Sequence, residues 1–152
     1  MKEKPIVGII ATSNYMKTND TFQDTYRYGN NYVKKLMAEG AIPYFIPLLD
    51  DGVILDSLCI CDGLLIPGGS EIKPFHFDII DYFYKRNKPI LGICLGMQAL
   101  AAYFQKDKKI LKRIDNGVDH HPVVLTRDNE TTLAHEIKIE KESLLYSIIK
   151  KD

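Results

Sequence analysis

Cysteine is scarce in this sequence, which excludes one large class of small proteins. The three cysteines, Cys59, Cys61 and Cys94, are an odd and small number among 152 residues, so no disulfide-stapled scaffold is expected. One residue separates Cys59 from Cys61, which suits neither a zinc knuckle nor a thioredoxin-type pair. We therefore expect both to be small buried hydrophobic residues.

Charge excess and long apolar runs are also absent. Twenty Lys and Arg balance twenty Asp and Glu, so the formal net charge is +0. Such a chain has no basic footprint for nucleic acid and no cationic tail for a membrane surface. No run approaches the roughly 20 apolar residues of a membrane-spanning helix. The apolar run that stops by Ala11 is too short for a signal-peptide core. We expect a cytoplasmic protein with neither nucleic acid nor membrane as partner.

What the sequence does contain is an alternation of strand-like and helix-like segments. Apolar runs of strand length occupy residues 5–11, 42–48, 62–66 and 89–94. Prolines in the second run indicate an edge strand or a strand end. Apolar spacing and Gly or Pro boundaries predict helices over residues 24–39, 52–58, 74–87 and 95–104. A polar loop is expected from residue 12 to about residue 21.

This order of elements predicts an α/β fold with a mainly parallel twisted sheet and helices on both faces. A chain of this length suits a single domain over residues 1–152. The last third differs in pattern. Residues 122–126 and 134–140 predict a small antiparallel hairpin near the C-terminus, and residues 141–150 predict a short helix. Ligands of such sheets bind at the carboxyl ends of the strands.

The most informative segment is Gly92-Ile93-Cys94-Leu95-Gly96, at the predicted junction of a strand and a helix. It has the form of a nucleophile elbow with Cys in place of Ser. Flanking glycines avoid clashes in so tight a turn, and the residue at its apex is strained. The sulfur would be exposed at a helix N-terminus, whose dipole favours a thiolate. The alternative is a buried cysteine in an ordinary turn.

A second feature is Pro67-Gly68-Gly69-Ser70, which follows the preceding strand. Neighbouring parallel strands would bring this turn beside Cys94. Paired glycines then let backbone N–H groups point at a developing oxyanion, with the N–H of Leu95 as a partner donor. Pro-Gly-Gly is also a common turn sequence, so its functional interpretation depends on Cys94.

Together these motifs resemble a known family. Gly-Ile-Cys-Leu-Gly-Met-Gln at 92–98 and Asp-Gly-Leu-Leu-Ile-Pro-Gly-Gly at 62–69 resemble the triad (class I) glutamine amidotransferases. Segments 4–9, 32–33 and 40–48 resemble the γ-glutamyl-γ-aminobutyrate hydrolase branch. The resemblance covers nearly the whole chain and implies a flavodoxin-like domain. It also implies cysteine-dependent hydrolysis of a γ-glutamyl amide, either glutamine or a γ-glutamyl amine, through a γ-glutamyl thioester.

The resemblance implies roles for individual residues. Cys94 becomes the nucleophile, Gly69 and Leu95 become oxyanion donors with Gly68 as a competitor, and Gln98 helps to position the γ-glutamyl group. The family's catalytic His serves as base and acid, and a Glu orients it. No cofactor is implied. The expected partner is a small γ-glutamyl substrate, and the sequence does not specify the amine half of that substrate.

Three departures from the branch affect these expectations. Leu95 stands where the branch has Arg, and Leu is usual in glutaminase subunits that feed a synthase. The segment between Gly69 and Pro74 is shorter than in the branch. The family's catalytic His and Glu follow the region matched here by residues 143–149, whereas this sequence stops at Asp152. We therefore expect a truncated domain that is incomplete as an enzyme.

The other histidines do not replace the missing one. His120 and His121 resemble a structural stretch of the family. No third metal ligand is visible near them in the sequence, so we assign no metal site. Surface or packing roles are expected for His76 and His135. Two alternatives stay open: a glutaminase subunit of an ammonia-using synthase, and a non-catalytic remnant or binding protein with the same fold. A homodimer through an exposed sheet edge, or a synthase partner, is expected accordingly.

Overall fold

The computed structural model describes residues 4–17, 22–49, 52–106, 111 and 138–149. They belong to two compact units, Met1–Lys112 and Arg113–Asp152. In the second unit the described helix is α4, Leu144–Ile149, and the Ser143 hydroxyl accepts a hydrogen bond from the Tyr146 N–H at 3.1 Å. The predicted C-terminal hairpin lies outside the described residues, except for 138–140, which are not in a strand. A single domain over 1–152 stays a prediction.

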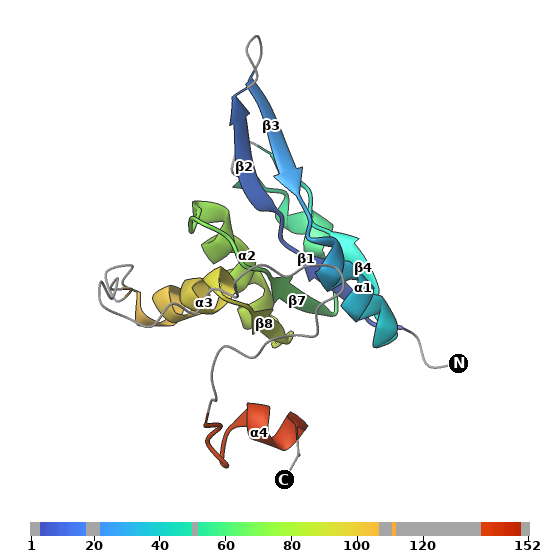
Figure 1. Cartoon of the computed structure of the whole chain (residues 1–152), viewed down its shortest axis with the longest axis vertical. Coiled ribbons are helices and arrows are strands. Elements are labelled where there is room, and N and C mark those ends of the chain that lie inside the picture. Colours follow the sequence, from blue (N-terminus) through green and yellow to red (C-terminus); the bar gives the residue numbers. More distant parts are fainter. Residues whose placement is uncertain (1–3, 18–21, 50–51, 107–110, 112–137, 150–152) are drawn as a thin grey trace, which may run out of the picture. The chain divides into compact units, whose positions relative to one another are not determined.

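The first unit is built on a four-stranded parallel sheet (Figure 1). Its order is β4-β1-β7-β8, with all three pairings parallel, as the alternating apolar runs predicted. The strands are β1 (Ile6–Ile9), β4 (Ile42–Phe45), β7 (Gly63–Ile66) and β8 (Ile90–Gly92). Pro43 lies in β4, at the end of this order, and this agrees with the expected edge position.

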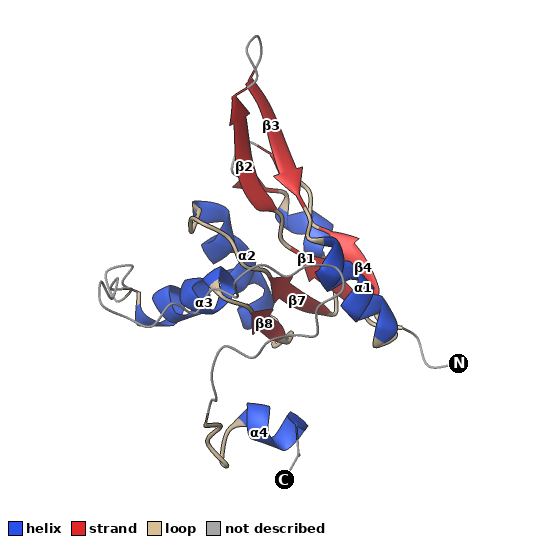
Figure 2. Cartoon of the chain, viewed as in Figure 1, coloured by secondary structure: helices blue, strands red, loops and turns tan. Residues whose placement is uncertain are grey.

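Among the described residues of this unit, three α-helices accompany the sheet (Figure 2): α1 (Asn30–Ala38), α2 (Pro74–Lys85) and α3 (Leu95–Gln105). Helix α1 contacts β4, and α3 contacts α2, β7 and β8. Leu64 and Ile66 join one core cluster with residues of α2. Because side chains alternate along a strand, the buried Leu65 points to the opposite face. Both faces of the sheet are therefore covered, as the α/β prediction required.

Helix α2 supplies much of that core. Phe75, Ile79 and Phe83 are fully buried and Tyr82 nearly so, as their helical spacing predicted. Burying each such side chain contributes about 1.5–3 kcal/mol. Pro74 occupies the first helical position, where its missing N–H has no partner to lose. The buried face of α2 therefore fixes the helix that follows the Pro67-Gly68-Gly69 turn.

The segment before α1 corrects the sequence-based prediction. Residues 12–27 form an antiparallel pair, β2 (Thr12–Lys17) with β3 (Phe22–Arg27), where a polar loop and the start of a helix were predicted. The helix begins only at Asn30, after an extended Gly29. Tyr28, just before the helix, is partly buried and packs against the core cluster. Its ring centroid lies 4.5 Å from that of Phe45, and its hydroxyl donates to the Ile46 carbonyl at 2.6 Å.

Two further predictions need correction. Residues 52–58 form β6 (Gly52–Val53), paired with β5 (Leu48–Leu49), and then a single 3-10 turn (Leu55–Leu58), not one helix. Cys61 is fully buried as expected, but Cys59 is exposed, because only Cys61 faces the core cluster. Among the helices described here, none is long and apolar enough to cross a membrane.

Candidate active site

Cys94 stands at the junction between β8 and α3 in a strained conformation. Its φ of 54° and ψ of −109° lie in a region that residues with a side chain rarely adopt, at a cost of about 1–3 kcal/mol. Hydrogen bonds on both sides hold the turn: the Ile93 N–H donates to Ile66 O at 2.9 Å, and the Gln98 N–H to Cys94 O at 3.1 Å. The side chain is exposed, so the alternative of a buried cysteine does not apply.

The two flanking glycines are required by the backbone around them. A Cβ on Gly92 would lie 2.5 Å from the carbonyl carbon of Gly96. A Cβ on Gly96 would lie 2.2 Å from the carbonyl oxygen of Ile66. Backbone atoms cannot move aside as a flexible side chain can. The Gly-x-Cys-x-Gly spacing is thus what allows α3 to start directly against β7 and to present residue 94 at the apex.

The Pro67-Gly68-Gly69 turn lies beside this cysteine. A Cβ built on Gly68 would be 3.5 Å from the Cβ of Cys94 and 3.8 Å from its Sγ. Parallel pairing of β7 with β8, Ile66 opposite Gly92, brings the ends of both strands to the same edge of the sheet. The structure therefore brings together the two turns that the sequence singled out.

Backbone donors are available at this meeting point. The N–H groups of Gly69 and Leu95 have no acceptor among the described residues, whereas the Gly68 N–H donates to the Tyr32 hydroxyl at 3.4 Å. A Cβ on Gly69 would come within 2.8 Å of Leu95 Cδ2, so the buried Leu95 side chain packs directly under the turn. The arrangement offers two free N–H groups next to one exposed sulfur.

Tyr32 is the site residue that sequence reasoning missed. Its position on α1 was interpreted as one of several apolar helical positions, but its hydroxyl reaches the turn beside Cys94. No local sequence signal marks it, because Tyr32 and Gly68 are 36 residues apart. Gln98, the predicted substrate contact, is half-buried one helical turn after Cys94 on α3.

His76 has a packing role, as expected. It is buried in the first turn of α2, where its Nδ1 accepts a hydrogen bond from the Lys73 N–H at 3.0 Å and its ring stacks on Phe75 at 4.4 Å. Burial lowers the pKa of its imidazole from the ordinary value of 6.5. His120, His121 and His135 lie outside the described residues.

A strained cysteine between a parallel strand and a helix, with a glycine turn alongside, defines the class of α/β proteins with a nucleophile-elbow geometry. Within that class the family can be named. The model of the class I glutamine amidotransferases matches residues 21–149, most of the chain, and this protein belongs to that family. The family acts on glutamine-type amides.

Three relatives illustrate the range of the family. A glutamine amidotransferase-like protein of Rickettsia prowazekii (strain Madrid E) is 32% identical over 143 residues, covering 79% of this chain and 50% of that protein. Gamma-glutamyl hydrolase 1 of Arabidopsis thaliana is 30% identical over 128 residues, covering 74% of this chain and 36% of that protein. The CTP synthase of Chlamydia trachomatis serovar A is 28% identical over 124 residues, covering 80% of this chain and 22% of that protein. This chain spans half or less of the length of each.

Proposed function

We propose that this protein hydrolyses the amide of a γ-glutamyl substrate, glutamine or a γ-glutamyl amine, with Cys94 as the nucleophile. The observation that carries the proposal is the exposed, strained Cys94 next to the Gly68-Gly69 turn, where the N–H groups of Gly69 and Leu95 have no acceptor among the described residues. The family membership supports the reaction class, and the resemblance of segments 4–9 and 40–48 supports the γ-glutamyl-γ-aminobutyrate hydrolase branch.

The reaction proceeds by acyl transfer. The thiolate of Cys94 attacks the γ-carbonyl carbon, the carbon–oxygen double bond opens to an oxyanion, and its collapse expels the amine, which takes up a proton. Water then cleaves the γ-glutamyl thioester and restores the thiol. The resemblance assigns the proton transfers to a histidine. We assign them to no described residue, because the acceptor nitrogen of His76 is already bonded and its ring is packed in the core.

Gly69 and Leu95 are the oxyanion donors in this proposal. Both N–H groups are free of acceptors among the described residues, while that of Gly68 is directed at the Tyr32 hydroxyl. Removing one such donor typically costs about 2.7–4 kcal/mol of transition-state stabilisation. Gln98 follows one turn later on the same helix, and we assign it a contact with the glutamyl group.

Labelling with an electrophilic glutamine analogue tests the assignment. We expect 6-diazo-5-oxo-L-norleucine to add one glutamyl-derived group to Cys94, detected by intact-mass and peptide mass spectrometry, and free glutamine to slow the reaction. Cys94→Ala abolishes the adduct, and Cys59→Ala, which removes the other exposed cysteine, leaves it unchanged. Absence of the adduct on Cys94, when iodoacetamide does alkylate it, would favour a non-catalytic protein of the same fold.

A second candidate is a glutaminase subunit that supplies ammonia to a synthase. Leu95, in the position directly after the nucleophile, and the similarity to a CTP synthase favour it. Hydrolysis of γ-glutamyl p-nitroanilide separates the two functions. Turnover without a synthase, by this chain or by a longer product of the same gene, supports the hydrolase. Labelling of Cys94 without turnover, with turnover restored by a synthase protein, supports the subunit.

A further inference from the structure

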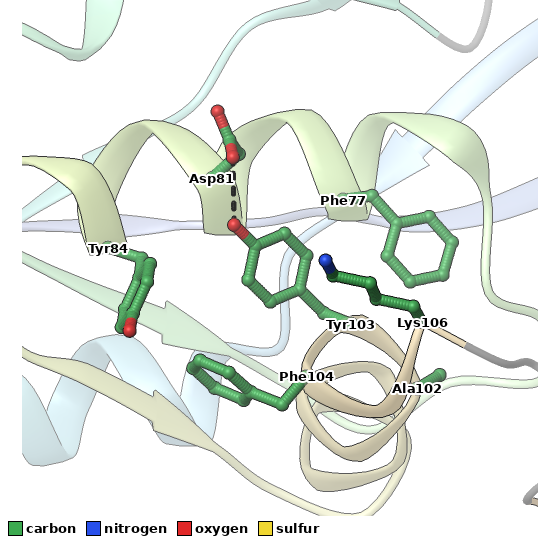
Figure 3. A pocket seen from close by; sticks show the side chains of 7 residues that line it. All are labelled: Phe77, Asp81, Tyr84, Ala102, Tyr103, Phe104 and Lys106. Carbon is green, nitrogen blue, oxygen red and sulfur yellow. Dashed lines mark hydrogen bonds between the residues drawn. The ribbon is translucent and has the colours of Figure 1, made fainter.

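A cavity of about 570 Å³ lies between α2 and the C-terminal half of α3 (Figure 3). Cys94 is not among the residues that line it. It is lined by Phe77, Asp81, Tyr84, Ala102, Tyr103, Phe104 and Lys106. Its volume is within the range of small-molecule sites, and such sites combine apolar walls with a few polar groups. Cys94 directly precedes α3, and the first α3 residue to line the cavity is Ala102, so about 12 Å along the helix separates them.

Three aromatic rings form one wall of the cavity. The ring centroids of Tyr84 and Phe104 are 5.0 Å apart, those of Tyr103 and Phe104 are 5.2 Å apart, and all three pairs meet edge to face. Tyr84 and Phe104 are each about half exposed, 54% and 51%, although they are large and apolar. Exposed rings in this arrangement offer flat surfaces to a planar ligand.

The charges of the cavity are unequal. Asp81 is satisfied on both oxygens, by Lys85 at 2.7 Å and by the Tyr103 hydroxyl at 2.8 Å. Lys85 and Tyr103 lower the pKa of this carboxyl, so it stays ionised and its charge is balanced by Lys85. Lys106, at the end of α3, has no ion pair with any residue the structure describes. Figure 3 shows its side chain extending between the rings of Phe77 and Tyr103.

We propose that this cavity binds a small planar aromatic anion, with its ring against Tyr84 and Phe104 and its carboxylate or sulfonate on the Lys106 ammonium. Charge complementarity selects the anion, because Lys106 is the cavity's one uncompensated charge among the described residues. A cation could lie on the aromatic rings, but it would be repelled by the Lys106 ammonium and would meet a carboxylate whose oxygens are already bonded. The site is independent of the proposed reaction at Cys94.

Fluorescence anisotropy with three naphthalene probes tests this site on the whole chain. The probes are 2-naphthoate, the neutral 2-naphthamide and the cationic 2-naphthylmethylamine, excited at wavelengths that tyrosine does not absorb; the chain has no tryptophan. We expect 2-naphthoate to bind about tenfold more tightly than the amide and the amine to bind most weakly. Equal affinity for all three probes, or no anisotropy change with any, overturns the proposal.

Variants locate the binding. Lys106→Met removes the preference for the anion: the affinity for 2-naphthoate falls about tenfold, and the affinity for 2-naphthamide does not change. Phe104→Ala and Tyr84→Leu weaken the binding of all three probes. Both side chains are about half exposed, so we expect the variants to fold, and circular dichroism checks this. Lys35→Met, on α1, and Cys94→Ala are matched controls that leave binding intact. Unchanged 2-naphthoate binding in Lys106→Met and Phe104→Ala places it elsewhere and overturns the proposal.

Discussion

The hydroxyl of Tyr32 accepts a hydrogen bond from the Gly68 N–H at 3.4 Å and so ties α1 to the turn beside Cys94. Tyr32→Phe leaves that N–H without its acceptor and frees the turn that presents Gly69. A neutral hydrogen bond is worth about 1 kcal/mol, so we expect labelling of Cys94 by the glutamine analogue to slow by about fivefold. Mass spectrometry against time gives the rate.

The control for this prediction is Tyr84→Phe. Tyr84 lies on α2 and contacts Tyr103 and Phe104, not the turn, so removing its hydroxyl should leave the labelling rate unchanged. The role of Tyr32 is refuted if Tyr32→Phe labels as fast as the unmodified chain. If the labelling rate and the stability in urea fall together in both Tyr32→Phe and Tyr84→Phe, the cause is a general effect of removing hydroxyl groups.

Gly96→Ala should destabilise the protein strongly. In an ordinary helix this change is favourable by about 1 kcal/mol. Here the added Cβ would lie 2.2 Å from the carbonyl oxygen of Ile66 and 2.8 Å from its Cβ, so α3 must move away from β7. We expect a loss of at least about 3 kcal/mol in urea unfolding.

Gly40→Ala separates this clash from backbone strain. Gly40 has a φ of +82° and open space around it, so its variant loses only about 1 kcal/mol, through the left-handed backbone alone. Equal losses at positions 40 and 96 would mean that the contact with Ile66 relaxes at little cost.

Cys94→Gly should stabilise the fold while it removes the sulfur. Cys94 has a positive φ, which costs a residue with a side chain about 1–3 kcal/mol and costs glycine nothing. The greater freedom of glycine in the unfolded chain cancels about 0.5–1 kcal/mol of this gain in stability. The matched variant Cys94→Ala keeps the Cβ and the strain. Guanidinium unfolding should rank Gly above Ala by about 1 kcal/mol; the reverse order would show that the turn is relaxed around residue 94.

His76 should make stability fall in mild acid. Burial lowers its folded-state pKa below 6.5, so as the pH falls the unfolded chain binds a proton before the folded chain does. This contribution is complete above the unfolded value, and it is lost as the pH falls from about 6.5 through the lower folded value. Protonation also removes the Nδ1 acceptor of the Lys73 N–H.

The variant His76→Gln isolates this effect. Glutamine offers an oxygen acceptor to the Lys73 N–H but does not titrate in this range. Urea midpoints compared between about pH 8 and about pH 5 should fall less steeply in the variant than in the unmodified chain. Identical slopes would assign the acid sensitivity to other groups.

The sheet and the elbow could be predicted because their signals are local. Residues 63–66 are buried at every position, which an uninterrupted apolar run indicates. A Cβ on Gly92 would clash with Gly96 inside the same strand–turn–helix unit, so the spacing of the two glycines indicates the turn, although Gly96 itself is required by Ile66 on the neighbouring β7. Helix α2 was predicted equally well, since Phe75, Ile79 and Phe83 share one face.

The rest depends on contacts between distant residues. The β2–β3 pair joins Thr12 to Arg27, and no helical or strand period of the intervening residues specifies that register. Tyr26 matched the helical spacing of α1, but the extended Gly29 separates it from that helix. The cavity between α2 and α3 brings together Tyr103 and Asp81, which are 22 residues apart and hydrogen-bonded, and no pattern within either helix reveals this contact.

Cys94 follows β8, which among the described strands is paired on one side only, whereas the Gly68-Gly69 turn follows β7, held between β1 and β8. An outer strand frays with less free energy than an inner one. The Cys94 sulfur and the proposed oxyanion donor on Gly69 should therefore separate while most of the sheet is still intact. Reactivity toward the glutamine analogue should vanish at a denaturant concentration where the far-ultraviolet spectrum has hardly changed.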